Sequence, residues 1–198
     1  MSEALKIGVM GGSFDPIHYG HLSLASTAAF KFGLDRVAFV PTNFSLQKKP
    51  VASPLDRCAM VSMAISKDPR FFLSKVDVER GGPTFAFDTI SDLSSLYFPC
   101  RLFFILGMDA LLWIEEWKNW EDLFEMSRFI VSKRPGYSLN LPKKMAEKVE
   151  VFSPPLLSIS STSIRKRVAK GEPIDYLTDP LVCGFISARG LYRKENCP

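Results

Sequence analysis

The stretch of residues 6–21, KIGVMGGSFDPIHYGH, decides the fold of this chain. Its first five residues, 6–10, are mostly apolar and stand before a Gly-Gly pair, a pattern that predicts a short buried strand broken at the glycines. Residues 19–32 have the apolar spacing of a helix, and Gly33 is well suited to end it. We therefore expect a strand, a sharp turn and a helix here.

Strand-like and helix-like segments alternate through the rest of the chain. Apolar runs predict further strands or extended segments at residues 37–40, 71–78, 102–106, 129–132 and 149–152. Helical spacing predicts helices at residues 54–66, 85–96, 110–115, 120–126, 163–170 and 179–188. This alternation is typical of an α/β fold with a Rossmann-like, doubly wound parallel sheet and helices on both faces. Without a repeat or an interdomain linker, residues 1–198 are expected to form a single domain.

The composition excludes several classes of protein. A chain of 198 residues with 46% hydrophobic and 23% charged residues is typical of a globular domain. No apolar stretch approaches the roughly 20 residues that cross a bilayer, and no signal peptide is recognisable, so no membrane partner is expected. The net charge of +4 is mild, and the short basic clusters could equally serve a polyphosphate, so nucleic acid is not expected either.

The cysteines show neither a CxxC pair nor the spacing of metal ligands. Free thiols in a chain without a signal peptide favour the cytoplasm as its compartment. The four are Cys58, Cys100, Cys183 and Cys197.

The turn after the first predicted strand is a candidate phosphate site. Gly11 and Gly12 let the backbone turn sharply and approach a ligand closely. Ser13 or Asp15 could cap the helix that follows, whose first N–H groups carry a partial positive charge. We expect this turn, with the backbone N–H groups of Ser13 and Phe14, to hold phosphates.

His18 and His21 are the only histidines of the chain, and their spacing of three puts them on one face of the predicted helix. One alternative is a core histidine beside a solvent-facing one. Another is a zinc pair, but zinc needs a third ligand, and no third His or well-placed Cys follows. Their position directly after a glycine turn favours a phosphate-facing pair, with Gly20 between them leaving room for the ligand.

A second candidate phosphate site is the segment 159–165, ISSTSIR, at the start of a predicted helix. Four consecutive hydroxyl residues are more than a helix cap requires. The hydroxyls of Ser160, Ser161 and Thr162 and the free N–H groups of the helix start form an anion site, and Arg165 adds a full charge. The alternative is an ordinary Ser/Thr cap followed by a solvated basic helix face.

Together, the GGSFDPIHYGH and ISSTSIR motifs resemble the signatures of the adenylyl- and cytidylyltransferase superfamily. Over nearly its whole length the chain resembles bacterial nicotinate mononucleotide adenylyltransferases. The resemblance implies that AMP is transferred from ATP to nicotinate mononucleotide, giving deamido-NAD and pyrophosphate in NAD biosynthesis, with Mg²⁺ arriving on the ATP. Further matching pieces are Gly107-Met108-Asp109, Trp117, Lys133-Arg134-Pro135-Gly136 and Arg189-Gly190-Leu191-Tyr192.

The resemblance also implies roles for individual residues, with His18, His21 and Arg165 as the catalytic ones. The nicotinate ring would pack on Trp117, and its carboxylate would meet backbone N–H groups near Thr84. The full nicotinate nucleotide set is Thr84, Phe85, Ala86, Asp109 and Trp117, where Asp109 would accept from ribose hydroxyls. The ATP and phosphate set is Gly11, Gly12, Ser13, Phe14, Lys48, Lys49, Ser160, Ser161, Thr162 and Arg134.

Residue chemistry supports two of these roles independently. An electron-poor pyridinium ring stacks well on an indole such as Trp117, whereas ordinary packing is expected for Trp113 and Trp120. The acceptor's 5′-phosphate has a second pKa near ~6, so it is mostly dianionic at neutral pH and needs no general base. We therefore expect His18 and His21 to act as hydrogen-bond donors, with Arg165 and Lys48 or Lys49 on the departing pyrophosphate.

Departures from the family pattern leave the acceptor open. The family's Pro-Pro-His-Lys is SLQK at residues 45–48, so Gln47 replaces the histidine, and Ala110 stands where Ser is common. Residues 84–86 are Thr-Phe-Ala in place of Ser-Tyr-Thr. The choice between nicotinate and nicotinamide mononucleotide therefore stays open. Pantetheine-phosphate adenylylation is a competing activity, a nucleotide sensor without catalysis is a competing function, and homo-oligomerisation is left open.

Overall fold

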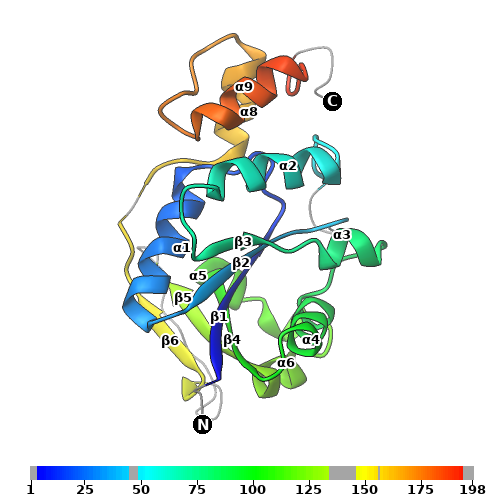
Figure 1. Ribbon diagram of the computed structural model, residues 1–198, viewed down its shortest axis with the longest axis vertical. Coiled ribbons are helices and arrows are strands. Elements are labelled where there is room, and N and C mark those ends of the chain that lie inside the picture. The colour runs from blue at the N-terminus through cyan, green and yellow to red at the C-terminus, as the bar shows by residue number, and fades with distance from the viewer. Residues whose placement is uncertain (1–3, 45–48, 134–145, 156, 194–198) are drawn as a thin grey trace.

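One parallel sheet runs through the centre of the protein, within residues 4–44, 49–133, 146–155 and 157–193, which the computed structural model describes (Figure 1). Its strands pair in the order β3-β2-β1-β4-β5-β6, and each neighbouring pair is parallel. This order confirms the predicted doubly wound sheet, whose order reverses between β1 and β4. The strands are β1 (Leu5–Gly12), β2 (Arg36–Pro41), β3 (Phe71–Leu73), β4 (Cys100–Gly107), β5 (Ser127–Ser132) and β6 (Val149–Phe152).

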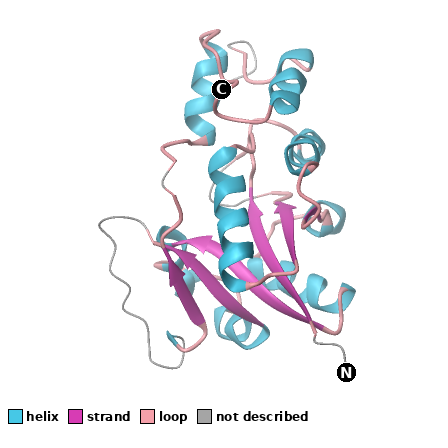
Figure 2. Ribbon diagram, turned by 60° about the vertical axis from the view of Figure 1, so that its left-hand side comes forward, coloured by secondary structure: helices cyan, strands magenta, loops and turns pink. Residues whose placement is uncertain are grey.

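Helices cover both faces of this sheet, as predicted, and Figure 2 shows α1 lying along one of them. Buried side chains of α1, α2 and α9 form one hydrophobic cluster with that face, and those of α4 and α6 form a second cluster with the other. The helices of the described residues are α1 (Tyr19–Phe32), α2 (Pro54–Ile65), α3 (Val76–Arg80), α4 (Ala86–Leu96), α5 (Met108–Leu111), the 3₁₀ turn η1 (Ile114–Glu116), α6 (Trp120–Met126), α8 (Ser161–Ala169) and α9 (Pro180–Ala188).

Helix boundaries follow from capping residues that the sequence carries. Gly33 ends α1 in the left-handed conformation, with φ 58° and ψ 44°, as predicted. The side-chain hydroxyls of Ser53 and Ser160 accept hydrogen bonds from backbone N–H groups at the starts of α2 and α8. The Asp179 carboxylate caps α9 in the same way. None of the helices in the described ranges is long and apolar enough to cross a membrane.

The prediction of one extended run over residues 71–78 is wrong. Only Phe71–Leu73 forms a strand, and Val76–Arg80 forms the short helix α3. One helical turn brings the carboxylate of Asp77 to 2.6 Å from the Arg80 guanidinium, and Asp77 also accepts from the Thr89 hydroxyl of α4. These contacts of a buried carboxylate favour the helix over the strand that the valines suggest.

The helix predicted over residues 110–115 is divided into α5 and the turn η1. Leu111 and Ile114 are both buried in the second hydrophobic cluster. The turn between them brings both side chains into the core and leaves Trp113 60% exposed. The ordinary packing predicted for Trp113 is therefore wrong. Trp120 does pack as predicted, edge-on to Phe124 with ring centroids 6.4 Å apart.

The carboxyl ends of the strands point to the end of the sheet at which α8 and α9 lie (Figure 1). The β1–α1 turn and the start of α8 meet at this end, because the Ser161 hydroxyl donates to the Pro16 carbonyl at 2.8 Å. Both predicted phosphate sites therefore occupy the position at which open α/β sheets bind their ligands.

Candidate active site

The sequence predicts that the β1–α1 turn bends at its two glycines, but in the structure it does not. Gly11 and Gly12 pair with Val40 and Pro41 of β2, so β1 continues through both of them. The bend falls on Phe14, whose φ of 47° lies in the left-handed region. A Cβ on Gly12 would lie 3.3 Å from the buried Phe14 ring, so this glycine leaves room for the ring that anchors the turn.

His18 and His21 stack on each other at the start of α1, with ring centroids 3.7 Å apart and planes 23° from parallel. Their predicted position on one helix face is confirmed. The His18 backbone N–H donates to Nδ1 of His21 at 3.3 Å, which leaves the proton of a neutral His21 on Nε2. A Cβ on Gly20 would meet the His18 ring at 3.0 Å, so Gly20 makes room for this imidazole rather than for a ligand directly.

Burial makes both imidazoles neutral near pH 7. It lowers the pKa of His18 from its ordinary 6.5 to about 4. It also lowers the pKa of His21 well below the ordinary value, and the neighbouring His18 adds to that shift. A neutral imidazole still offers one N–H donor, and its lowered pKa makes it a weak base, which agrees with the predicted role of donors rather than bases.

Asp15 does not cap α1, and neither does Ser13, because His18 is the N-cap residue. The buried Asp15 carboxylate instead accepts from the backbone N–H groups of Val51 and Ala52, at 2.8 and 3.1 Å. It also accepts from the hydroxyl of Tyr192 at 2.8 Å. These bonds fasten the β1–α1 turn to the segment before α2 and to the end of the described chain.

The start of α8 is fastened to the same turn. Arg165 donates to the backbone carbonyl of Asp15 at 2.7 Å, and its guanidinium lies 3.7 Å from the Asp15 carboxylate. The Thr162 hydroxyl accepts from the same guanidinium at 3.3 Å. The Ser160 hydroxyl caps α8 by accepting from the Ser163 N–H, so part of the run of hydroxyl residues serves to form the helix. The two predicted phosphate sites are thus one continuous surface.

A cavity of about 790 Å³ lies over this surface. Most residues predicted for catalysis and for ATP line it. Asp109, predicted for the nicotinate nucleotide, lines this cavity as well. The sequence-predicted residues in it are Ser13, His18, His21, Lys49, Asp109, Ser160, Ser161, Thr162 and Arg165.

A second cavity of about 530 Å³ contains the other predicted set. Trp117 lines it from the segment after η1, with its ring edge-on to Phe104 at a centroid distance of 6.1 Å. Gly11 and Gly12, predicted for the ATP phosphates, line this cavity rather than the first. Ser13 lines both cavities, so they meet at this residue. The remaining predicted residues in the second cavity are Thr84, Phe85 and Ala86.

Some predicted residues lie elsewhere. Phe14 is buried and lines neither cavity. Lys48, Arg134 and Gln47 lie outside the described residues. Within the described ranges, no group of three or more His, Cys, Asp or Glu side chains is arranged to hold a metal ion.

Sequence reasoning missed Arg57, whose side chain is completely buried beside the turn. Burial lowers the pKa of its guanidinium, while the nearby Asp15 carboxylate opposes that shift. The signal was present in the helical spacing, because Arg57 shares the face of Met60, Val61 and Ala64, which are all buried. A lone arginine on the apolar face of a helix needs buried partners.

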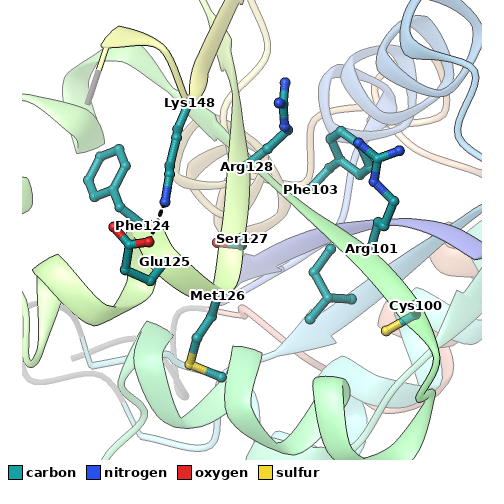
Figure 3. A pocket seen from close by; sticks show the side chains of 10 residues that line it. Cys100, Arg101, Phe103, Phe124, Glu125, Met126, Ser127, Arg128 and Lys148 are labelled. Carbon is teal, nitrogen blue, oxygen red and sulfur yellow. Dashed lines mark hydrogen bonds and ion pairs between the residues drawn. The ribbon is translucent and has the colours of Figure 1, made fainter. Parts of the chain in front are cut away.

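A third cavity, of about 260 Å³, lies at the amino ends of β4 and β5 and contains none of the predicted residues (Figure 3). Lys148 reaches across it to Glu125 at 2.7 Å, and the exposed Arg101 and Arg128 stand on the adjacent strands. This cavity opens at the opposite end of the strands from the two cavities that share Ser13.

Comparison with known proteins identifies the family of this chain. A family model described as cytidylyltransferase-like matches residues 9–167. A protein of Saccharopolyspora erythraea named "Probable nicotinate-nucleotide adenylyltransferase" is 47% identical over 201 residues, which cover 99% of this chain and 93% of that protein. One of the same name from Streptomyces coelicolor is also 47% identical, over 94% of this chain and 100% of its own.

Solved structures share the fold. Nicotinic acid mononucleotide adenylyltransferase of Plasmodium falciparum, complexed with NaAD, superposes with a TM-score of 0.77 at 24% identity, covering 95% of this chain and 97% of that one. A Vibrio parahaemolyticus protein described as a nicotinate-nucleotide adenylyltransferase superposes with a TM-score of 0.71 at 19% identity, covering 96% of each chain. The family model and the full-length relatives show that the chain belongs to the cytidylyltransferase-like family, among its nicotinate-nucleotide adenylyltransferases.

Proposed function

We propose that this enzyme transfers AMP from Mg-ATP to nicotinate mononucleotide, giving deamido-NAD and pyrophosphate. The observation that carries the proposal is the meeting of two cavities at Ser13. One is lined by the histidine pair and the α8 start, and the other by Trp117 and the start of α4. A reaction that joins two phosphorylated molecules needs two adjoining sites with the reacting phosphates at their junction.

The first cavity suits the triphosphate. The N–H groups at the starts of α1 and α8 supply partial positive charge, and Arg165 and Lys49 supply full charges for the β- and γ-phosphates. Asp109 lines this side, so its proposed partner is a ribose hydroxyl of ATP. Mg²⁺ enters as part of the Mg-ATP substrate, where it neutralises phosphate charge, and the proposal assigns it no protein cage.

The second cavity suits the nicotinate nucleotide. The pyridinium ring stacks on Trp117, and the carboxylate faces the free N–H groups at the start of α4, whose N-cap is Phe85. Lys118, also in the lining, lies 5.1 Å from the centre of the Phe85 ring. Its ammonium is ion-paired with the Asp88 carboxylate at 2.9 Å, so the N–H groups at the start of α4 are what favour the acid form of the ring substituent over the amide.

Chemistry at the junction is a displacement at phosphorus. An oxygen of the 5′-phosphate attacks the α-phosphorus of ATP, the bond to the β-phosphate oxygen breaks, and pyrophosphate leaves with that electron pair. The attacking dianion has no proton to lose, so no general base is required. His18 and His21, both neutral, donate N–H groups to the oxygens on which charge develops.

Pyrophosphate release tests this proposal. The purified protein with Mg-ATP and nicotinate mononucleotide is expected to release pyrophosphate and to form a dinucleotide of the mass of deamido-NAD. Absence of both products at saturating substrate would contradict the proposal. We further propose a cytoplasmic location, because the cysteines of the described part, Cys58, Cys100 and Cys183, are all free thiols.

A further inference from the structure

Arg57 lies at the centre of the hydrogen bonds that hold the two cavities together. Its guanidinium donates to the carbonyl of Ser13 at 2.7 Å and to the carbonyl of Thr42 at 2.6 Å. It also donates to the carbonyls of Asn43 and Ala52, at 3.1 and 3.3 Å. A completely buried guanidinium with four carbonyl acceptors joins three separate segments of the chain.

These segments line the cavities or carry residues that do. Ser13 stands at the junction of both cavities, and Thr42 lines the second. The backbone N–H of Asn43 donates to the Thr84 hydroxyl at 3.0 Å, and the Thr84 N–H donates to the Phe44 carbonyl at 2.9 Å. Thr84, which lines the second cavity, is therefore connected to the β1–α1 turn through the loop that Arg57 holds.

Arg57 also determines which way one peptide group faces. In a trans peptide the carbonyl and the N–H point in opposite directions, and the Ser13–Phe14 bond is trans. Since the Ser13 carbonyl points to Arg57, the Phe14 N–H points away from it. This N–H donates to no other group within the described ranges, and the left-handed φ of Phe14 keeps the peptide in this orientation. It is thus left without a protein partner in the described ranges, next to the residue at which the two cavities meet.

We propose that Arg57 is a positioning residue, which acts through the Ser13–Phe14 peptide and the loop after β2 to hold the two cavities in register. The proposal rests on the proposed function, since register affects rate only if a substrate occupies each cavity. Lysine cannot replace this side chain, because a single ammonium with three donors cannot span four carbonyls that a planar five-donor fork reaches. Because Arg57 sets the register of the two cavities, its replacement by lysine should lower kcat more than it weakens substrate binding.

Steady-state kinetics of Arg57→Lys tests this role, with Arg70→Lys as the matched control. Arg70 is paired with Asp68 and lines neither cavity. In Arg57→Lys we expect kcat to fall roughly 10²-fold, as for a misplacement of reacting groups by about 1 Å. The KM values for ATP and nicotinate mononucleotide should each change by less than about threefold. Arg70→Lys should keep kcat within about twofold of wild type, as a surface substitution does.

A second variant separates positioning from stability. Arg57→Ala removes the whole fork, and ethylguanidinium at millimolar concentration should restore part of kcat if the missing contacts limit the rate. Unchanged kcat in folded Arg57→Lys, with only a lower melting temperature, would overturn the proposal. So would failure of both variants to fold, because Arg57 would then serve folding itself. If wild type releases no pyrophosphate, the proposed function fails instead, which the wild-type assay detects separately.

Discussion

The hydroxyl of Tyr192 donates a 2.8 Å hydrogen bond to the carboxylate of Asp15, although 177 positions separate them in the chain. Both side chains are buried, and the carboxylate raises the pKa of Tyr192 further than burial alone. Asp15 also accepts from the backbone before α2 and lies beside Arg165. One buried carboxylate therefore connects the first turn of the chain, the ISSTSIR helix and the final described turn.

Tyr192→Phe tests the strength of this connection. Removing the hydroxyl leaves a buried carboxylate with one donor fewer, which is expected to lower the free energy of unfolding by about 2 kcal/mol. Urea denaturation measures it. Tyr176→Phe is the control, because Tyr176 is 55% exposed. Removing its hydroxyl should change the free energy of unfolding by no more than about 0.5 kcal/mol. Equal losses in the two variants would show that the Asp15 bond adds no stability.

His18→Ala should lose turnover while remaining folded. The variant removes one N–H donor from the junction, and such losses typically lower kcat on the order of 10²–10³-fold. The fold should be retained, because the His18 side chain makes no capping hydrogen bond at the helix start. Pyrophosphate release and far-UV circular dichroism measure the two effects. Activity near that of wild type in a folded variant would end the assignment of His18 as a donor.

The place of the candidate site could be predicted from the sequence, because the histidine pair and the ISSTSIR segment are local patterns at the ends of predicted elements. The doubly wound parallel sheet followed from the alternation of strands and helices, whereas the order of its strands came from the structure. What could not be predicted are contacts between distant residues, such as Asp15 with Tyr192 and Arg57 with Ser13. Asp15 looked like a helix cap because spacing cannot show that its carboxylate has other partners.

Trp117→Ala should raise the KM for nicotinate mononucleotide and leave the KM for ATP nearly unchanged, because Trp117 lines only the second cavity. Loss of one aromatic stacking contact of about 1 kcal/mol corresponds to roughly a fivefold rise. Trp113→Ala is the matched control, since Trp113 is exposed and lines neither cavity. A matching rise in the KM for ATP would contradict the stacking role.

The lowered pKa of His18 predicts a loss of stability in acid. Below pH 6.5 the unfolded chain gains a proton on this imidazole, whereas the folded protein does not until about pH 4. The stability that the neutral His18 contributes is therefore complete above pH 6.5. It is lost as the pH falls toward 4, by about 3 kcal/mol in total. Urea midpoints from pH 7 to 4 should fall more steeply for wild type than for His18→Gln. Parallel slopes would mean that His18 titrates normally in the folded state.

Turnover with different acceptors tests the central claim most directly. The protein is incubated with Mg-ATP and, in separate reactions, nicotinate mononucleotide, nicotinamide mononucleotide or phosphopantetheine, and kcat/KM is measured from pyrophosphate release. The account predicts the highest kcat/KM for nicotinate mononucleotide, about tenfold or more above that for the amide if the N–H groups at the α4 start contribute roughly 1.4 kcal/mol. A higher value for nicotinamide mononucleotide or phosphopantetheine, or no release with any acceptor, would contradict it.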